Sequence, residues 1–188
     1  MRFLAIPQPA TGRLISVRVG KLGRSLGLLK SSKLTRDSAF LGVESRRGRN
    51  SMLAGILLAT SATIAVFLGL AHVYLTFFTR AFAARDADLE EKLKSVSPRI
   101  SGQTTMWRAG VGFHASHALG IVFFGLVYGY LALAGRDFLI RSPFLVVLGA
   151  LVLLGYVVLA KLYWFDRPLL GVAVALTCYV AGVAVAYA

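Results

Sequence analysis

Four apolar stretches, each long enough to cross a lipid bilayer, occupy most of the chain after residue 51. They are residues 52–78, 109–134, 143–165 and 169–188. A spanning helix needs about 20 mostly apolar residues, because the hydrocarbon core is about 30 Å thick and a helix rises about 1.5 Å per residue. The 57% hydrophobic content lies in these blocks, without a period-2 or amphipathic pattern. The sequence therefore predicts an all-α protein, a membrane-embedded four-helix bundle formed by residues 52–188, with no room for a second folded domain.

Residues 1–51 have a different composition. They are rich in Arg, Lys, Ser and Gly, carry a net charge of +9 and contain no acidic residue before Asp37, whereas residues 52–188 carry a net charge of +4. Three interpretations are open. The segment is a disordered basic tail, a transit-like presequence of the Arg- and Ser-rich kind, or no part of the native protein because translation starts at Met52.

The distribution of basic residues among the connections favours the third interpretation. Orientation follows the excess of Lys and Arg in short cytoplasmic loops. For a chain that starts at Met52, a cytoplasmic first connection gives eight basic residues inside and two outside, with both termini outside. Adding residues 1–51 on the inside gives 13 inside and eight outside, a weaker asymmetry. We therefore expect a start at Met52 and a multi-pass protein of the bacterial inner membrane.

The connection at residues 79–108 contains a candidate amphipathic helix between the first two spans. Phe82, Leu89, Leu93 and Val96 fall at offsets of 0, 7, 11 and 14, which places them on one helical face. Acid-before-base pairs at i,i+4 favour a helix too, and a proline ends it. These residues are Asp88 with Lys92, Glu90 with Lys94, and Pro98. We expect the helix to lie on the membrane surface, with its run of acidic side chains facing solvent.

All three histidines lie inside predicted spans. His72 lies seven residues before Thr79, where the first span ends, and His114 and His117 lie six and nine residues after Arg108, where the second begins. These two spans are antiparallel, so a rise of about 1.5 Å per residue puts the three imidazoles on one level, about 9–14 Å below the shared membrane face. Ionisable side chains inside a membrane are costly and mark functional sites. The three histidines are therefore candidate ligand- or metal-binding residues.

Small residues on the same helix faces predict close packing of the first two spans. Ser61 and Gly69 lie on the face of His72, and Gly125 lies on the face of the other two histidines. Gly125 and Gly129 form a GxxxG pair, which lets membrane helices approach closely. We expect these faces to meet and to bring the histidines together.

Several chemistries suit three imidazoles on one level. They can be hydrogen-bond partners between helices, which is a purely structural role. They can bind a transition metal or, from two facing helices, haem iron. They can also relay protons or bind a ligand. The metal hypothesis lacks a strong motif, because HxxH alone is weak and these spans contain no cysteine or carboxylate to complete a zinc or di-iron site.

Residues 104–119 read TTMWRAGVGFHASHAL and contain the pattern T-x-W-x-x-x-x-G-F-x-x-S-H. This stretch resembles a family of small, functionally uncharacterised bacterial four-span integral membrane proteins. Upstream residues that belong to the resemblance are Gly69, His72, Arg85 and Asp86. The resemblance covers residues 52–188 and implies a four-span fold but no activity. Relatives commonly have Asn where this chain has His114, which favours His72 and His117 as the better pair.

Aromatic residues lie at the ends of the spans. Trp107 and Arg108, at the mouth of the second span, suit either an interfacial anchor or a gate above the histidines. Residues 163–165, Tyr-Trp-Phe, form a matching interfacial belt at the end of the third span. The single cysteine, Cys178, excludes an intrachain disulfide and is interpreted as a small packing residue.

The sequence contains no nucleophile–base pair, P-loop, dinucleotide fingerprint or cysteine-based metal motif, which favours a non-enzymatic role. We expect an integral membrane protein that acts through helix packing or partner binding. A membrane redox, metal- or haem-binding protein that uses the histidines is the alternative, and a small transporter is the third hypothesis. The expected partners are the lipid bilayer and a second copy or another membrane protein. Positive charge beside membrane spans is a topology signal, so no nucleic-acid partner is expected.

Overall fold

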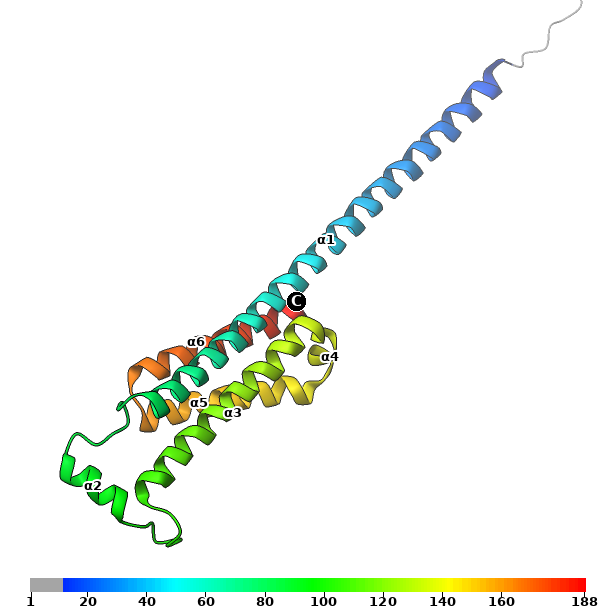
Figure 1. The fold of residues 1–188 in the computed structure, drawn as a ribbon. Coiled ribbons are helices and arrows are strands. Elements are labelled where there is room, and N and C mark those ends of the chain that lie inside the picture. Colours follow the sequence, from blue (N-terminus) through cyan, green and yellow to red (C-terminus); the bar gives the residue numbers. More distant parts are fainter. Residues whose placement is uncertain (1–11) are drawn as a thin grey trace, which may run out of the picture. The chain divides into compact units, whose positions relative to one another are not determined.

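The computed structural model describes the backbone of residues 12–188 and the side chains from residue 44 onward, and every regular element in that part of the chain is a helix. The helices are α1 (Gly12–Phe78), α2 (Ala87–Ser95), α3 (Met106–Ala134), α4 (Arg136–Arg141), α5 (Pro143–Tyr163) and α6 (Asp166–Tyr187) (Figure 1). The all-α class predicted from the sequence is therefore confirmed for the described residues.

Four of these helices are long and apolar enough to cross a membrane. They are the Glu44–Phe78 part of α1, and the whole of α3, α5 and α6. The predicted positions of the four apolar stretches are confirmed, although α1 begins well before residue 52 and the ends of α3, α5 and α6 differ from the prediction by up to three residues. The hydroxyl of Thr105 accepts a hydrogen bond from the backbone N–H of Arg108 at 3.3 Å, so α3 begins three residues before the predicted position.

The upstream part of α1 belongs to the basic segment of residues 1–51, for which the sequence leaves three interpretations open. The structure describes this segment as helix from Gly12 onward, and each of the three interpretations stays a prediction. The segment is rich in Leu, Arg and Lys, which are strong helix formers, and both of its prolines precede Gly12. Residues 1–11 lie outside the described part of the chain. The chain divides into two units, Met1–Gly48 and Arg49–Ala188, and all contacts described below belong to the second.

Helices α1 and α3 pack closely and antiparallel through small residues. A Cβ atom at Gly69 would lie 2.5 Å from Cγ2 of Val122, and one at Gly125 would lie 2.7 Å from the carbonyl oxygen of Ala62. Gly129 is less crowded, since a Cβ atom there would lie 3.4 Å from Cβ of Ala62. The structure thus places all three glycines that the sequence selects at one interface, and two of them allow the backbones to come close.

Helix α6 completes the bundle between α1 and α5. The buried hydroxyl of Ser61 donates a 2.7 Å hydrogen bond to the carbonyl oxygen of Ala175. Further along, Gly182 lies against Leu58, where an added Cβ atom would be 2.9 Å from Cγ. Helices α1 and α6 are therefore antiparallel. On its other side α6 contacts α5, and the hydroxyl of Tyr179 donates to a carbonyl oxygen in the first turn of α5 at 3.0 Å.

Side-chain hydrogen bonds tie the helices together at the end of the bundle that carries α4, which we call the base. Tyr128 and Tyr187 donate 2.7 Å hydrogen bonds to carbonyl oxygens of α5 and α4. Arg136 donates to the carbonyl oxygen of Ser51 at 2.7 Å and to its hydroxyl at 2.5 Å. Ser51 is therefore part of the compact unit, one residue before the expected start at Met52.

The outward faces of the apolar helices carry large apolar side chains. Phe123 and Phe144 are 70% and 72% exposed, and Leu133 is 80% exposed. The interior instead holds mostly small and aromatic residues, such as Ala65 and Tyr179. The outward face therefore differs from that of a water-soluble bundle, in which the outward face of each helix carries polar side chains.

Candidate functional site

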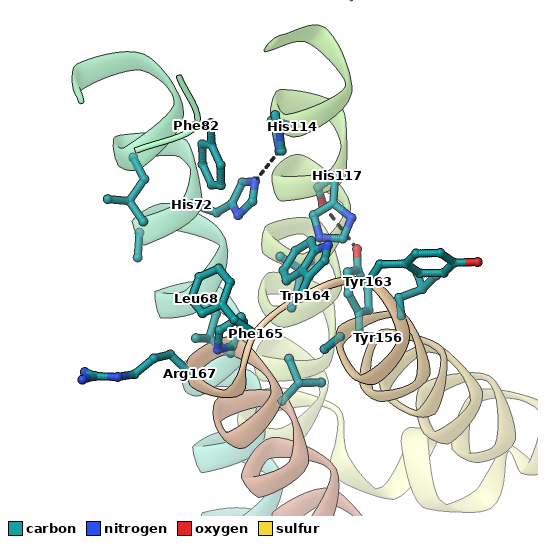
Figure 2. Close-up of a pocket in the computed structure, with 17 residues that line it drawn as sticks. Leu68, His72, Phe82, His114, His117, Tyr156, Tyr163, Trp164, Phe165 and Arg167 are labelled. Carbon is teal, nitrogen blue, oxygen red and sulfur yellow. Dashed lines mark hydrogen bonds between the residues drawn. The ribbon is translucent and has the colours of Figure 1, made fainter. Parts of the chain in front are cut away.

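A cavity of about 440 Å³ lies at the end of the bundle opposite the base. Its walls come from the ends of α1 and α5, the first half of α3, the α5–α6 connection, the start of α6 and Phe82 of the first connection (Figure 2). His72, His114 and His117 all line it, together with mainly apolar and aromatic side chains. Pockets of about 300–1,000 Å³ with a few convergent polar groups are typical small-molecule sites. The structure thus brings the three selected histidines together in one cavity.

His72 and His114 are hydrogen-bonded to each other across α1 and α3. Nε2 of His72 and Nδ1 of His114 are 3.2 Å apart, and the direction of the bond depends on the tautomers (Figure 2). An imidazolium has no acceptor nitrogen, so at least one of the two rings is neutral. Both rings are half-buried. The pair therefore links the two helices at the level that the antiparallel arrangement predicts.

His117 lies beside this pair without bonding to it. Its ring centroid is 5.5 Å from that of His72, 4.7 Å from that of Trp164 and 5.1 Å from that of Tyr156. The hydroxyl of Tyr156 donates to the backbone carbonyl oxygen of His117 at 3.3 Å, so it leaves the imidazole free. Within the part of the chain that the structure describes, neither ring nitrogen of His117 has a hydrogen-bond partner.

Flat aromatic rings form the walls around the histidines. Trp164 stacks on His72, with 5.4 Å between ring centroids and 14° between ring planes. Phe82 stacks on His114, with 4.3 Å between centroids and 17° between planes. Trp164 follows the last residue of α5 in an extended conformation, with φ −119° and ψ −160°. The helix break therefore places an indole next to the histidines.

Phe82 corrects the sequence prediction for the first connection. The predicted apolar stripe puts Phe82 on the surface helix, but α2 begins only at Ala87. The reason is a cap: the carboxylate of Asp86 accepts a hydrogen bond from the backbone N–H of Asp88 at 2.9 Å. Phe82 lies before this cap, in a non-helical segment that reaches the histidines. In the described residues the predicted ion pair between Asp88 and Lys92 does not form.

An ion-pair network holds the first connection against α2. Glu90 accepts hydrogen bonds from Arg80 and Lys94 at 2.6 Å each, which confirms the predicted pair of Glu90 with Lys94. Glu90 is only 8% exposed, so the prediction that the whole acidic run faces solvent is wrong at this residue, because two cations cover it. The hydrogen bond from Lys94, followed by that from Arg80, lowers the pKa of the Glu90 carboxyl. Lys94 also lies 5.3 Å from the ring centroid of Trp107 on α3.

Trp107 and Arg108 do not line the cavity. Trp107 is half-buried beside Lys94, and Arg108 is exposed. The exposed aromatic residues at the cavity edge are instead Tyr163 and Phe165, which are 74% and 63% exposed.

The α5–α6 connection is the part of the site that sequence reasoning missed. Residues 163–165 are interpreted from the sequence as an interfacial belt, yet all three line the cavity. A signal was available, because the third span of an antiparallel bundle ends on the same side as the first. The Tyr-Trp-Phe run must therefore lie near the end of α1 that carries His72.

Charge is scarce in the cavity. Apart from the histidines, Arg167 is the one ionisable Lys, Arg, Asp or Glu among the lining residues that the structure describes. Arg167 is exposed, and Figure 2 shows its side chain directed away from the histidines. An ionic ligand would therefore lose hydration without gaining a charged partner beside the imidazoles.

The arrangement suits a metal ion poorly. Among the side chains that the structure describes, from residue 44 onward, no group of three His, Cys, Asp or Glu is placed to hold a metal ion. The facing nitrogens of His72 and His114 bond to each other, so a transition metal or haem iron could bind between those two nitrogens only if the pair separated. Cys178 is half-buried in α6 and does not line the cavity.

Comparison of the chain with known protein families, with curated proteins and with solved structures finds no match in any of the three. Function therefore has to be argued from the helices and the cavity themselves.

Proposed function

We propose that the chain is a multi-pass integral membrane protein of the bacterial inner membrane, and a member of the four-span family that its T-x-W-x-x-x-x-G-F-x-x-S-H stretch resembles. Four helices of sufficient length and the exposed apolar side chains on their outward faces support the multi-pass membrane part of this proposal, because lipid would cover those faces. In this arrangement α2 lies on the membrane surface. The exposed side chains of Leu89 in α2 and of Val96, which directly follows it, then contact the headgroup region.

We infer further that the protein acts by binding a small, uncharged and mostly apolar molecule in the histidine-lined cavity, without catalysis. The observation that carries this proposal is a cavity of about 440 Å³ with aromatic walls and three imidazoles. Such a site combines apolar area for affinity with a few polar groups for orientation. A redox role that uses a metal or haem ranks second because, among the side chains that the structure describes, no group of three possible ligands is placed to hold a metal ion. A transport role ranks third because the cavity lining contains little charge.

The two tryptophans of the chain offer a direct test, since Trp164 lines the cavity and Trp107 does not. Trp107→Phe leaves the cavity tryptophan as the single reporter, and Trp164→Phe leaves the outside one. Both full-length variants are reconstituted in lipid nanodiscs and titrated with 1-bromonaphthalene, an apolar quencher of indole fluorescence. We expect saturable quenching of Trp164 and linear quenching of Trp107, because the latter meets only probe dissolved in the lipid.

A filled cavity provides the matched control for this titration. Ala71 lines the cavity, and Val158 of α5 is 46% exposed and does not. Ala71→Phe should remove the saturable component, and Val158→Phe should keep it. Saturable quenching that is equal for both tryptophans, or that survives Ala71→Phe in a protein of unchanged melting temperature, would contradict binding in the cavity.

A further inference from the structure

The hydrogen bond between His72 and His114 determines what the pair offers to a third group. If Nε2 of a neutral His72 donates, its Nδ1 is a bare acceptor and Nε2 of His114 carries a hydrogen. If His114 donates instead, the two outer nitrogens exchange these roles. The pair therefore presents one donor and one acceptor at its two ends, and a change of tautomer exchanges them.

His117 adds a second polar group that the described residues leave unpaired. A neutral imidazole has one donor and one acceptor nitrogen, and those of His117 face a mostly apolar and aromatic cavity without a protein partner. A polar group in apolar surroundings is costly unless a hydrogen bond satisfies it. A ligand that fits this site therefore carries oxygen or nitrogen atoms within reach of the imidazoles.

The walls limit the shape and the charge of that ligand. Trp164 and Phe82 are stacked against two of the imidazoles with interplanar angles of 14° and 17°, so flat faces border the space. Aromatic surfaces of this kind favour a planar ring that can stack in an offset arrangement. Arg167 is exposed and directed away from the imidazoles, so the ligand is uncharged.

From these properties we infer that the cavity binds a quinone or the corresponding quinol. This inference rests on the proposed function, that the cavity takes a small apolar molecule. A quinone is a neutral planar ring whose oxygens accept hydrogen bonds, and its reduced form donates them. The His72–His114 pair meets both forms because its donor and acceptor ends exchange. An aromatic hydrocarbon would leave the imidazoles unpaired, and an organic acid would bury a charge without a cation beside it.

The test compares two bicyclic probes that differ in their oxygens, menadione and 1-bromonaphthalene. Both are titrated into the full-length Trp107→Phe protein in nanodiscs, and the Trp164→Phe protein supplies the correction for partitioning and light absorption. We expect menadione to bind more tightly than 1-bromonaphthalene after that correction. Adding His117→Phe keeps a ring beside Trp164 and removes both nitrogens. It should raise the dissociation constant of menadione about three- to tenfold, as one lost hydrogen bond would, and change that of 1-bromonaphthalene by less than about twofold.

A matched control removes a polar group from the same helix outside the cavity. Tyr130 is 70% exposed on α3 and does not line the cavity, so Tyr130→Phe should change neither dissociation constant. If His117→Phe weakens the binding of both probes by the same factor, His117 only shapes the cavity, and the quinone inference is overturned. If His117→Phe does not fold, equal binding of the two probes to the parent protein would overturn it as well.

The outcomes separate this inference from the proposed function. Saturable binding of 1-bromonaphthalene without saturable binding of menadione would overturn the quinone assignment and leave a cavity for apolar molecules. If neither probe saturates, the proposed function itself fails.

Discussion

Alanine substitutions at Gly125 and Gly129 should have opposite effects on stability, although the two glycines form one GxxxG pair. A Cβ atom at Gly125 would lie 2.6 Å from Cγ2 of Val66, 2.7 Å from the carbonyl oxygen of Ala62 and 2.9 Å from the backbone nitrogen of Val66. Two of these three atoms belong to the backbone of α1, which cannot rotate away. A Cβ atom at Gly129 would meet only Cβ of Ala62 at 3.4 Å, an ordinary contact.

Two opposing terms determine how much each substitution changes the free energy of unfolding. Replacing a glycine inside a helix by alanine gains about 1 kcal/mol at either position. Overpacking a tight interface costs about 1–3 kcal/mol, and contact with backbone atoms puts Gly125 at the upper end of that range. We therefore expect Gly125→Ala to lower the free energy of unfolding by about 1–2 kcal/mol and Gly129→Ala to raise it by up to about 1 kcal/mol.

The measurement is the free energy of unfolding of the full-length protein in one mild detergent, from a titration with denaturing detergent and from the melting temperature. Gly155→Ala calibrates the helix term, because nothing lies within 4 Å of the position of an added Cβ atom at Gly155. If Gly125→Ala proves as stable as Gly129→Ala, the close approach of α1 and α3 at Gly125 is refuted. If all three variants, Gly125→Ala, Gly129→Ala and Gly155→Ala, are less stable than the parent, the assumed gain in helix propensity is refuted instead.

Three further predictions concern other contacts. Ser61→Ala should lower the free energy of unfolding by about 0.5–1.5 kcal/mol, because it removes a buried interhelical hydrogen bond, whereas Thr63→Ala, whose hydroxyl is exposed and bonds within α1, should have almost no effect in the same denaturation assay. Gly149→Ala should destabilise the protein by about 1–3 kcal/mol, because an added Cβ atom would collide with tyrosine rings of α3 and α6; a melting temperature equal to that of the parent would refute this packing. The pKa of Glu90 lies below its ordinary value of 4.5, so its stabilising ion pairs are complete above that pH and are lost as the pH falls through the lowered value. The protection of amide hydrogens against exchange in residues 87–95, after correction for the intrinsic exchange rate at each pH, should therefore fall on acidification in the parent protein and stay the same in Glu90→Gln. The same loss of protection in Glu90→Gln as in the parent would contradict the role of the carboxylate.

Much of the architecture follows from one property of the sequence, the length of its apolar runs. That property predicts four helices and their antiparallel order, and the order then puts His72, His114 and His117 on one level. The same argument applies to the Tyr-Trp-Phe run at residues 163–165, which lies beside them for the same reason.

The directions of individual side chains could not be predicted in this way. Phe82 fits a helical stripe by spacing, but the cap at Asp86 starts the helix later and leaves Phe82 free to reach the histidines. From the sequence Glu90 is expected to face solvent like its acidic neighbours, but in the structure Arg80 and Lys94 cover its carboxylate. Such outcomes depend on competition between nearby contacts, which hydrophobic periodicity does not record.

From its hydrogen bonds, we expect the bundle to be stiffer at the base than at the cavity end. Tyrosine hydroxyls and the Arg136 guanidinium fasten the helices to one another at that end, through bonds of 2.5–2.7 Å. At the cavity end, the interhelical hydrogen bonds among the described residues are the longer ones of His72 with His114 and of Tyr156 with the backbone of His117, at 3.2 and 3.3 Å. We expect the helices to pivot at the base. A bound ligand would then be accommodated by a small separation of the helices at the cavity end, while the helices at the base keep their relative positions.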